Sequence, residues 1–122
     1  MRTMADNPIR IISLLISELE LTSDQALIFL YTIRNRKSTI SQMCMELGIE
    51  ENTILLAVNN LVDNGMLFSL DNMLFETFHP RFSVVNCHRI RCERLGISWG
   101  KNAKIDALGA LLEGYYESAR TK

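Results

Sequence analysis

The chain has 122 residues, of which 48% are hydrophobic and 22% are charged, and its formal net charge is −1. This balance predicts one folded domain with a real core and excludes an intrinsically disordered chain, and no apolar run reaches the roughly 18 residues that span a bilayer. With three cysteines and no signal-peptide pattern, we expect reduced thiols in a cytoplasmic protein that has no membrane partner.

Four helices are predicted in the first half of the chain. Pro8 suits the first position of a helix, and the capping boxes Thr22–Gln25 and Thr39–Gln42 start two more. Gly48 and Gly65 are expected to end the third and fourth helices, the fourth running from about residue 51 to 64. The expected buried stripes are Ile9, Ile12, Ile16 and Leu19; Ala26, Phe29, Leu30 and Ile33; Ile40, Met43, Cys44 and Leu47; and Ile54, Val58, Leu61 and Val62. The second helix is expected to end in a basic cluster formed by Arg34, Arg36 and Lys37.

The second half is predicted to hold a hairpin and two helices. Short apolar stretches over 66–70 and 73–78 flank Asp71-Asn72 and predict a β-hairpin, with Asp-Asn a weaker turn signal than Asp-Gly or Asn-Gly. A helix is expected from His79-Pro80 to about Leu95, where Gly96 ends it, and a last helix from about residue 102 to 119. We therefore expect one compact domain with an N-terminal helix over 1–20, a winged helix-turn-helix over 21–79 and a C-terminal helical region over 80–122.

The order of helix, short helix, glycine turn, helix and hairpin is that of a winged helix-turn-helix. Leu21–Ala26, Ile40-Ser41, Met45–Ile49 and Leu61–Leu67 resemble the winged-helix domain of TrmB-like archaeal transcription regulators and, less closely, of MarR-type regulators. The resemblance covers about half of the chain. It implies a dimeric DNA-binding regulator whose second motif helix enters the major groove, and the sugar-binding domain of larger members has no room here. The predicted fold class is mainly α, with a small β-hairpin wing and flanking N- and C-terminal helices.

The predicted DNA-reading region carries the wrong charge for this function. Residues 38–80 contain six carboxylates and no Lys or Arg, a net charge of −6. DNA affinity depends largely on Lys and Arg at the phosphates, and base contacts alone rarely suffice. The outward face of the recognition helix is expected to present Asn52, Leu56, Asn59, Asn60 and Asp63, of which the first four are the residues expected to contact DNA. A solvated helix face and a winged helix repurposed as a protein-interaction module in a larger assembly are the alternatives.

Positive charge is concentrated farther along the chain. Residues 81–104 contain six Lys or Arg and one Glu, a net charge of +5. This run predicts either a flank that contacts DNA phosphates or a docking surface for an acidic partner. The acidic region of a second copy is one such partner. An ordinary solvated helix face is the alternative. The residues expected to contact the DNA backbone or a partner are Arg34, Arg36, Lys37, Arg81, Arg89, Arg91 and Arg94.

Cys87, His88 and Cys92 raise the question of a metal or redox site. His88 and Cys92 share a helix face, but Cys87 points about 140° away from Cys92 at helical periodicity. We expect buried thiols, no metal and no cofactor, with a redox-sensing thiol as an alternative because neighbouring arginines lower a cysteine pKa. The sequence has no glycine-rich phosphate loop, paired carboxylates or serine–histidine arrangement, so it predicts that the protein is not an enzyme.

The terminal helices predict a homodimer. Their apolar stripes repeat at helical spacing, and a core of three helices and a hairpin is too small to cover both, although packing on the chain's own core is the alternative. The residues expected at the dimer interface are Ile12, Ile16, Ile105, Leu108, Leu112 and Tyr115. The sequence thus predicts a winged-helix protein that binds double-stranded DNA, as a dimeric transcription regulator, with the protein-interaction module as the alternative.

Overall fold

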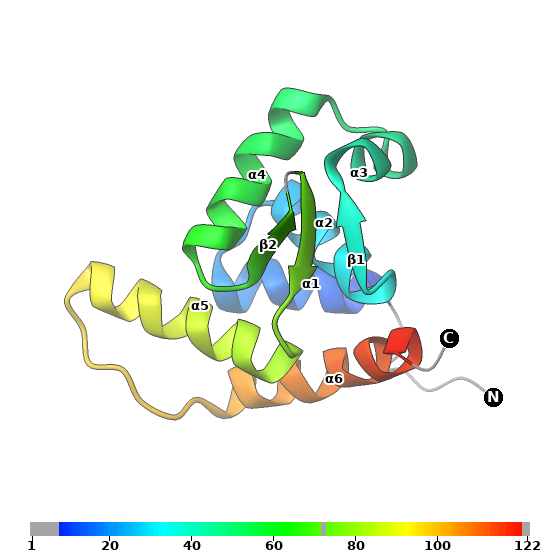
Figure 1. Cartoon of the computed structure of the whole chain (residues 1–122). Coiled ribbons are helices and arrows are strands. Elements are labelled where there is room, and N and C mark those ends of the chain that lie inside the picture. The colour runs from blue at the N-terminus through cyan, green and yellow to red at the C-terminus, as the bar shows by residue number, and fades with distance from the viewer. Residues whose placement is uncertain (1–7, 72, 121–122) are drawn as a thin grey trace.

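The computed structural model describes residues 8–71 and 73–120. In chain order its elements are α1 (Pro8–Leu19), α2 (Ser23–Arg34), β1 (Lys37–Thr39), α3 (Ile40–Leu47), α4 (Glu51–Asp63), β2 (Leu67–Asp71), β3 (Leu74–Thr77), α5 (Pro80–Leu95) and α6 (Ala103–Arg120) (Figure 1). The described chain is mainly helical and has one small antiparallel sheet. No described helix combines the length and the apolar character needed to cross a membrane.

α2 is the central helix of the molecule. The Thr22–Gln25 capping box starts it as predicted, with the Gln25 N–H donating to Thr22 Oγ1 and the Thr22 N–H donating to Gln25 Oε1. α2 contacts α1, α3, α4, α6, β1 and β3. The stripe predicted for α2, Ala26, Phe29, Leu30 and Ile33, is buried, and so is Ile28. Helices from both ends of the chain therefore pack around α2 in one core.

α3 and α4 form the helix pair that was predicted around Gly48. The Thr39–Gln42 capping box starts α3, and Gly48 ends it in the left-handed conformation (φ 66°) that favours glycine. α4 buries Ile54, Ala57, Val58 and Leu61. The expectation that Val62 is buried was wrong, since the buried side of α4 is centred nearer Ala57 and leaves Val62 exposed.

The sheet contains one strand more than the predicted hairpin. β2 and β3 form the hairpin, and β1 pairs with the outer side of β3, giving the order β1-β3-β2. α2 ends at Arg34, so only this member of the expected basic cluster lies in its last turn. Arg36 lies in the following turn with φ 71°, and Lys37 lies opposite Glu76 in the β1–β3 register. Asn72, in the predicted hairpin turn, lies outside the described residues.

α5 and α6 form an antiparallel pair below the rest of the molecule (Figure 1). Pro80 occupies the first turn of α5, and Gly96 ends α5 in the left-handed conformation, as predicted. Gly109 of α6 faces the start of α5, where an added Cβ would lie 3.2 Å from the Arg81 Cα. The glycine therefore permits the close approach of the two helices at this point.

α1 buries a different stripe from the predicted one. Ile11, Leu15 and Leu19 are buried, whereas Ile9 and Ile16 are exposed. Apolar residues cover most of the circumference of α1, so periodicity alone allowed two stripes. Packing on α2 and α6 selects between them. Residues 1–7, which the predicted helix over 1–20 includes, lie outside the described residues.

Phe29→Ala should destabilise the fold by about 3–5 kcal/mol, because it empties a fully buried position in the middle of the core. Urea unfolding followed by circular dichroism measures the change. Leu56→Ala, at an exposed position of α4, is the control and should change the free energy of unfolding by less than about 0.5 kcal/mol. Equal effects of the two substitutions would contradict the central role of α2.

Candidate interaction surface

The outward face of α4 presents the residues that the sequence predicted. Asn52, Leu56, Asn59 and Asn60 are all exposed, and the side chain of Leu56 has 69% of its surface accessible. Three amides and a large apolar group on one helix offer hydrogen bonds and contact area, but no positive charge. This face alone therefore has no group that could neutralise a phosphate.

A hollow of about 500 Å³ lies between α3 and the start of α4. The α3–α4 hollow, as we call it, is lined by Ile40, Ser41, Cys44, Met45, Ile49, Glu50 and Glu51. Four of these residues are apolar, and one of the four, Met45, is 80% exposed. Glu50 and Glu51 stand at the N-terminus of α4, where the helix dipole favours carboxylates. An apolar side chain with a cationic neighbour would complement this hollow.

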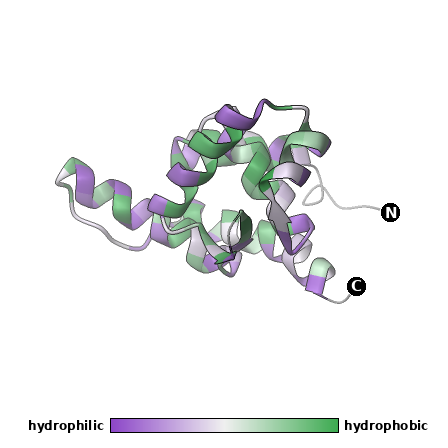
Figure 2. Cartoon of the chain, turned by 45° about the horizontal axis from the view of Figure 1, so that its top comes forward, coloured by the Kyte–Doolittle hydropathy of each residue, from purple (hydrophilic) through white to green (hydrophobic). Residues whose placement is uncertain are grey.

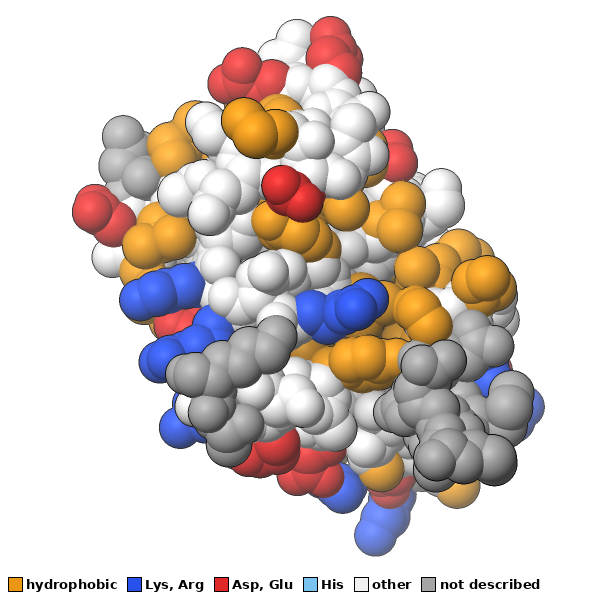
Figure 3. Space-filling view, turned by 90° about the vertical axis from the view of Figure 1, so that its right-hand side faces the viewer, with side chains coloured by type: hydrophobic (Ala, Val, Ile, Leu, Met, Phe, Trp, Pro, Cys, Tyr) orange, Lys and Arg blue, Asp and Glu red, His pale blue; other side chains and the backbone are white. Residues whose placement is uncertain are grey.

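Sequence reasoning did not find the hollow. Met45 and Ile49 flank the Gly48 turn and were assigned no binding role, and Cys44 was expected to be buried. The signal that was available is the pairing of apolar residues with Glu46, Glu50 and Glu51 around one turn. Figure 3 shows the result: the upper end of the molecule, which holds α3 and the start of α4, displays Asp and Glu side chains around hydrophobic ones, and the Lys and Arg side chains in this view lie below it.

Several of the arginines expected to contact DNA already have partners within the chain. Arg81 pairs with Glu113 (2.9 Å), Arg89 with Glu93 (3.1 Å) and Arg91 with Glu20 (2.9 Å). The Arg34 guanidinium stacks over the ring of Tyr115, 5.4 Å from its centroid. Arg36, Lys37 and Arg94 are exposed. The basic charge therefore serves in part to hold the C-terminal helices, and less of it is available to phosphates than the sequence count implies.

A second depression brings arginines to the far end of α4. It has a volume of about 300 Å³ and lies where the start of α2, the end of α4 and α5 meet. Its polar lining includes Gln25, Asn60, Asn64, Arg91 and Arg94. The Oδ1 atom of Asn64 is buried and has no hydrogen-bond partner among the described residues. Amides and guanidinium groups thus line a depression beside α4 that offers cations to an anion, although Glu20, the ion-pair partner of Arg91, lines it as well.

The residues expected at a dimer interface fall into three groups by burial. Ile105, Leu108 and Leu112 are buried in the chain's own core, so they are not free to pair with a second copy as predicted. The heptad spacing of α6 reflects packing on α1, α2 and α5. Ile16 is exposed, whereas Ile12 and Tyr115 are half-buried against the core. The prediction that the apolar stripe of α6 forms the dimer interface was thus wrong: the stripe packs within the chain.

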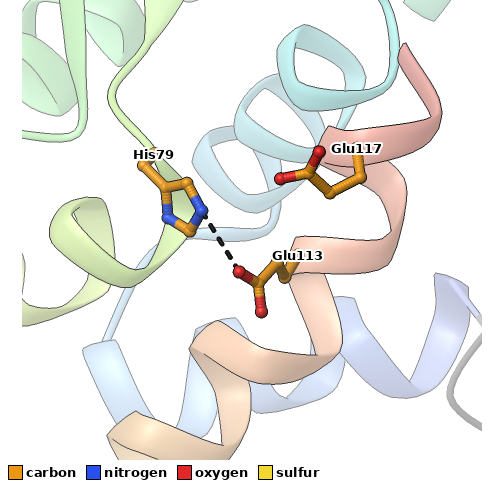
Figure 4. A group of neighbouring side chains, drawn as sticks. All are labelled: His79, Glu113 and Glu117. Atoms are coloured by element: carbon orange, nitrogen blue, oxygen red, sulfur yellow. Dashed lines mark ion pairs between the residues drawn. The ribbon is translucent and has the colours of Figure 1, made fainter. Parts of the chain in front are cut away.

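A cluster of His79, Glu113 and Glu117 has the composition of a metal site (Figure 4). His79 Nδ1 accepts the backbone N–H of Arg81 (3.2 Å), so the neutral ring carries its proton on Nε2, which lies 3.3 Å from Glu113 Oε2. A metal ion bound at Nε2 would displace this proton, and the ring would then carry none, because Nδ1 accepts the N–H of Arg81. Arg81 also binds Glu113 Oε1 through its Nε and a terminal nitrogen. This geometry favours an ion-pair cluster that joins α5 to α6.

Glu113→Gln should lower the free energy of unfolding most at neutral pH. The hydrogen bonds from Arg81 hold the pKa of Glu113 below its ordinary value, and this effect outweighs the opposing effect of burial. A lowered pKa in the folded state contributes stability above the unfolded pKa, and this contribution is lost as the pH falls through the folded value. Urea unfolding at pH 7, 5 and 3 should show the two proteins converging in acid. A constant difference, or one as large for Glu46→Gln on α3, would contradict the assignment.

The three cysteines differ in accessibility. Cys87 and Cys92 are buried, and Cys44 is half-buried at the α3–α4 hollow. Burial raises the pKa of Cys87 to about 11, although Arg91 and Arg94 act in the opposite direction. The expectation that neighbouring arginines lower a cysteine pKa therefore fails for Cys87, because burial has the larger effect. Cys92 Sγ lies 3.9 Å from His88 Nε2, but Cys87 does not join this pair in any four-ligand site among the described residues.

Cys44 should react with iodoacetamide well before Cys87 in the native protein at pH 8. With a pKa of about 11, roughly one Cys87 thiol in a thousand is ionised at that pH, and the side chain is also shielded. Mass spectrometry of peptides after timed alkylation measures the order. Urea should abolish the difference, and equal labelling rates in the native state would contradict it.

No protein-family model, curated protein or solved structure matches the chain. The assignment of a function therefore depends on the chemistry of the surfaces described above.

Proposed function

We propose that this chain is a winged helix-turn-helix domain that acts as a protein-binding module through the α3–α4 hollow. The element order α2-β1-α3-α4-β2-β3, the left-handed Gly48 turn and the three-stranded sheet support the winged-helix part. The Ile40 N–H donates to the Met73 carbonyl (3.1 Å), which ties the start of α3 to the hairpin. On this proposal, the chain resembles TrmB-like regulators in its architecture but does not share their DNA ligand.

The observation that carries the function is the charge around the hollow. Glu50 and Glu51 line it, Glu46 follows Met45 on α3, and no Lys or Arg occurs between residues 38 and 80. Rows of phosphates border both sides of the major groove of DNA, and carboxylates brought close to them would be repelled. A protein surface that carries an apolar side chain and Lys or Arg instead gains contact area and complementary charge at once.

DNA binding, as in a dimeric transcription regulator, is the second candidate function, and one observation favours it. The depression at the end of α4 brings Asn60 and Asn64 together with Arg91 and Arg94. Asn59 and Asn60 can each read an adenine edge, while Arg94 contacts a neighbouring phosphate. Arg91 would first have to leave Glu20, which reduces the free energy available for binding.

Nuclear magnetic resonance titrations of the full chain distinguish the two functions. A short peptide of lysines and tryptophans should shift the amide resonances of Cys44, Met45 and Ile49, whereas random duplex DNA at about 50 mM and 200 mM salt should leave them unchanged. Glu50→Lys with Glu51→Lys should remove the peptide shifts by reversing the charge of the hollow. Asp63→Lys with Glu117→Lys changes the charge by the same amount at two exposed positions outside the hollow; it is the matched control and should retain them.

The contrary result is equally specific. Salt-sensitive shifts at Asn59, Asn60 and Arg94 with DNA, and none with the peptide, would reject the protein-binding proposal and establish the second candidate. Arg94→Ala would then reduce the slope of log affinity against log salt by up to about one unit.

A further inference from the structure

The end of α5 and the loop that follows it project from the body of the molecule. Both Figure 1 and Figure 2 show this part extending away from the packed helices. Large apolar side chains are exposed along it: Leu95 has 63%, Ile97 56% and Trp99 48% of its surface accessible. We call residues 94–104 the arm. Three such side chains within five residues form an apolar stretch larger than scattered exposed residues explain.

The arm also carries positive charge. Arg94, Lys101 and Lys104 are exposed on it, and none of them belongs to the ion pairs that hold Arg81, Arg89 and Arg91. The arm contains no Asp or Glu. It therefore combines an exposed aromatic group with flanking cations, which is the chemistry that the α3–α4 hollow requires of a partner.

We propose that the arm of one copy docks in the α3–α4 hollow of a second copy. Trp99 enters the hollow beside Cys44 and Met45, and Lys101 and Lys104 face Glu50 and Glu51. A tryptophan side chain buries about 150–250 Å² at such a contact and is a common anchor of interfaces, and the hollow of about 500 Å³ accommodates it. This inference rests on the proposed protein-binding function and names its partner.

The contact joins two different surfaces of the chain. If each of two copies inserts its arm into the hollow of the other, they form a closed dimer with two equal contacts. If the arm binds a third copy instead, the chains form a larger oligomer. Either assembly differs from the dimer that the sequence predicted, because Ile105, Leu108 and Leu112 remain inside each subunit.

A disulfide between copies tests the docking directly. One protein carries Trp99→Cys with Cys44→Ser, and the wild-type chain supplies Cys44. Mild oxidation of the mixture should join Cys44 of the wild type to the cysteine introduced at position 99, as identified by mass spectrometry. Phe82→Cys with Cys44→Ser is the matched control, since Phe82 is 67% exposed on α5 outside the arm, and it should give at least about tenfold less product. Equal yields would overturn the inference.

Charge reversal tests the same contact without a new bond. Sedimentation of the wild type should show association at micromolar concentration, with a blue shift in the emission of Trp99, the single tryptophan of the chain. Glu50→Lys with Glu51→Lys, or Lys101→Glu with Lys104→Glu, should weaken association by roughly tenfold or more. Mixing the two variants should restore it, which shows in the same measurement that both are folded.

Two outcomes separate this inference from the proposed function. A species of 13.9 kDa at about 100 μM, with unshifted emission, would overturn docking between copies; binding of the lysine–tryptophan peptide would then still support a protein-binding hollow. Association that survives both charge reversals would overturn the arm as the contact. If the wild-type chain shows neither self-association nor peptide binding, the inference and the proposed function are rejected together.

Discussion

α2 is covered on almost every side, and this burial decides where the neighbouring helices and the sheet lie. Ile28, Phe29 and Ile33 are fully buried, and even Thr32 is enclosed, with its hydroxyl donating to the Ile28 carbonyl (2.8 Å). Each neighbouring element uses its own apolar side to cover α2. The acidic side chains of α3 and α4 consequently face outward, since their inner sides are occupied by the core. The position of the hollow is thus a result of how the core is covered.

Local signals in the sequence predicted most of the fold. The two capping boxes, Gly48 and Gly96 act on residues close to them in the chain, so the helix limits followed to within a few residues. β1 was missed because three residues show no usable period, and their order comes from pairing with a strand more than thirty positions away. The buried stripe of α1 was misjudged because nearly its whole circumference is apolar, and only its neighbours decide the rotation.

The candidate site was less predictable, for reasons that concern distance along the chain. The separation of acidic and basic regions is visible in the sequence, because formal charge is a property of each residue. The ion pairs that occupy Arg81 and Arg91 join residues 32 and about 70 positions apart, and no local pattern predicts them. The heptad spacing of α6 correctly indicated a buried side, but periodicity does not say whether the covering surface belongs to the same chain or another.

The pairing of α5 and α6 has a further consequence for how the protein can change over evolutionary time. The two helices are joined at one end, where Gly109 lies against Arg81 and Glu113 pairs with His79. At the opposite end, the last part of α5 and the loop after it project into solvent (Figure 1). Substitutions at exposed positions of this end, such as Leu95 and Ile97, change no buried side chain and carry little folding penalty. The sequence of this projecting end can therefore vary with little effect on the stability of the fold, whereas the joined end cannot.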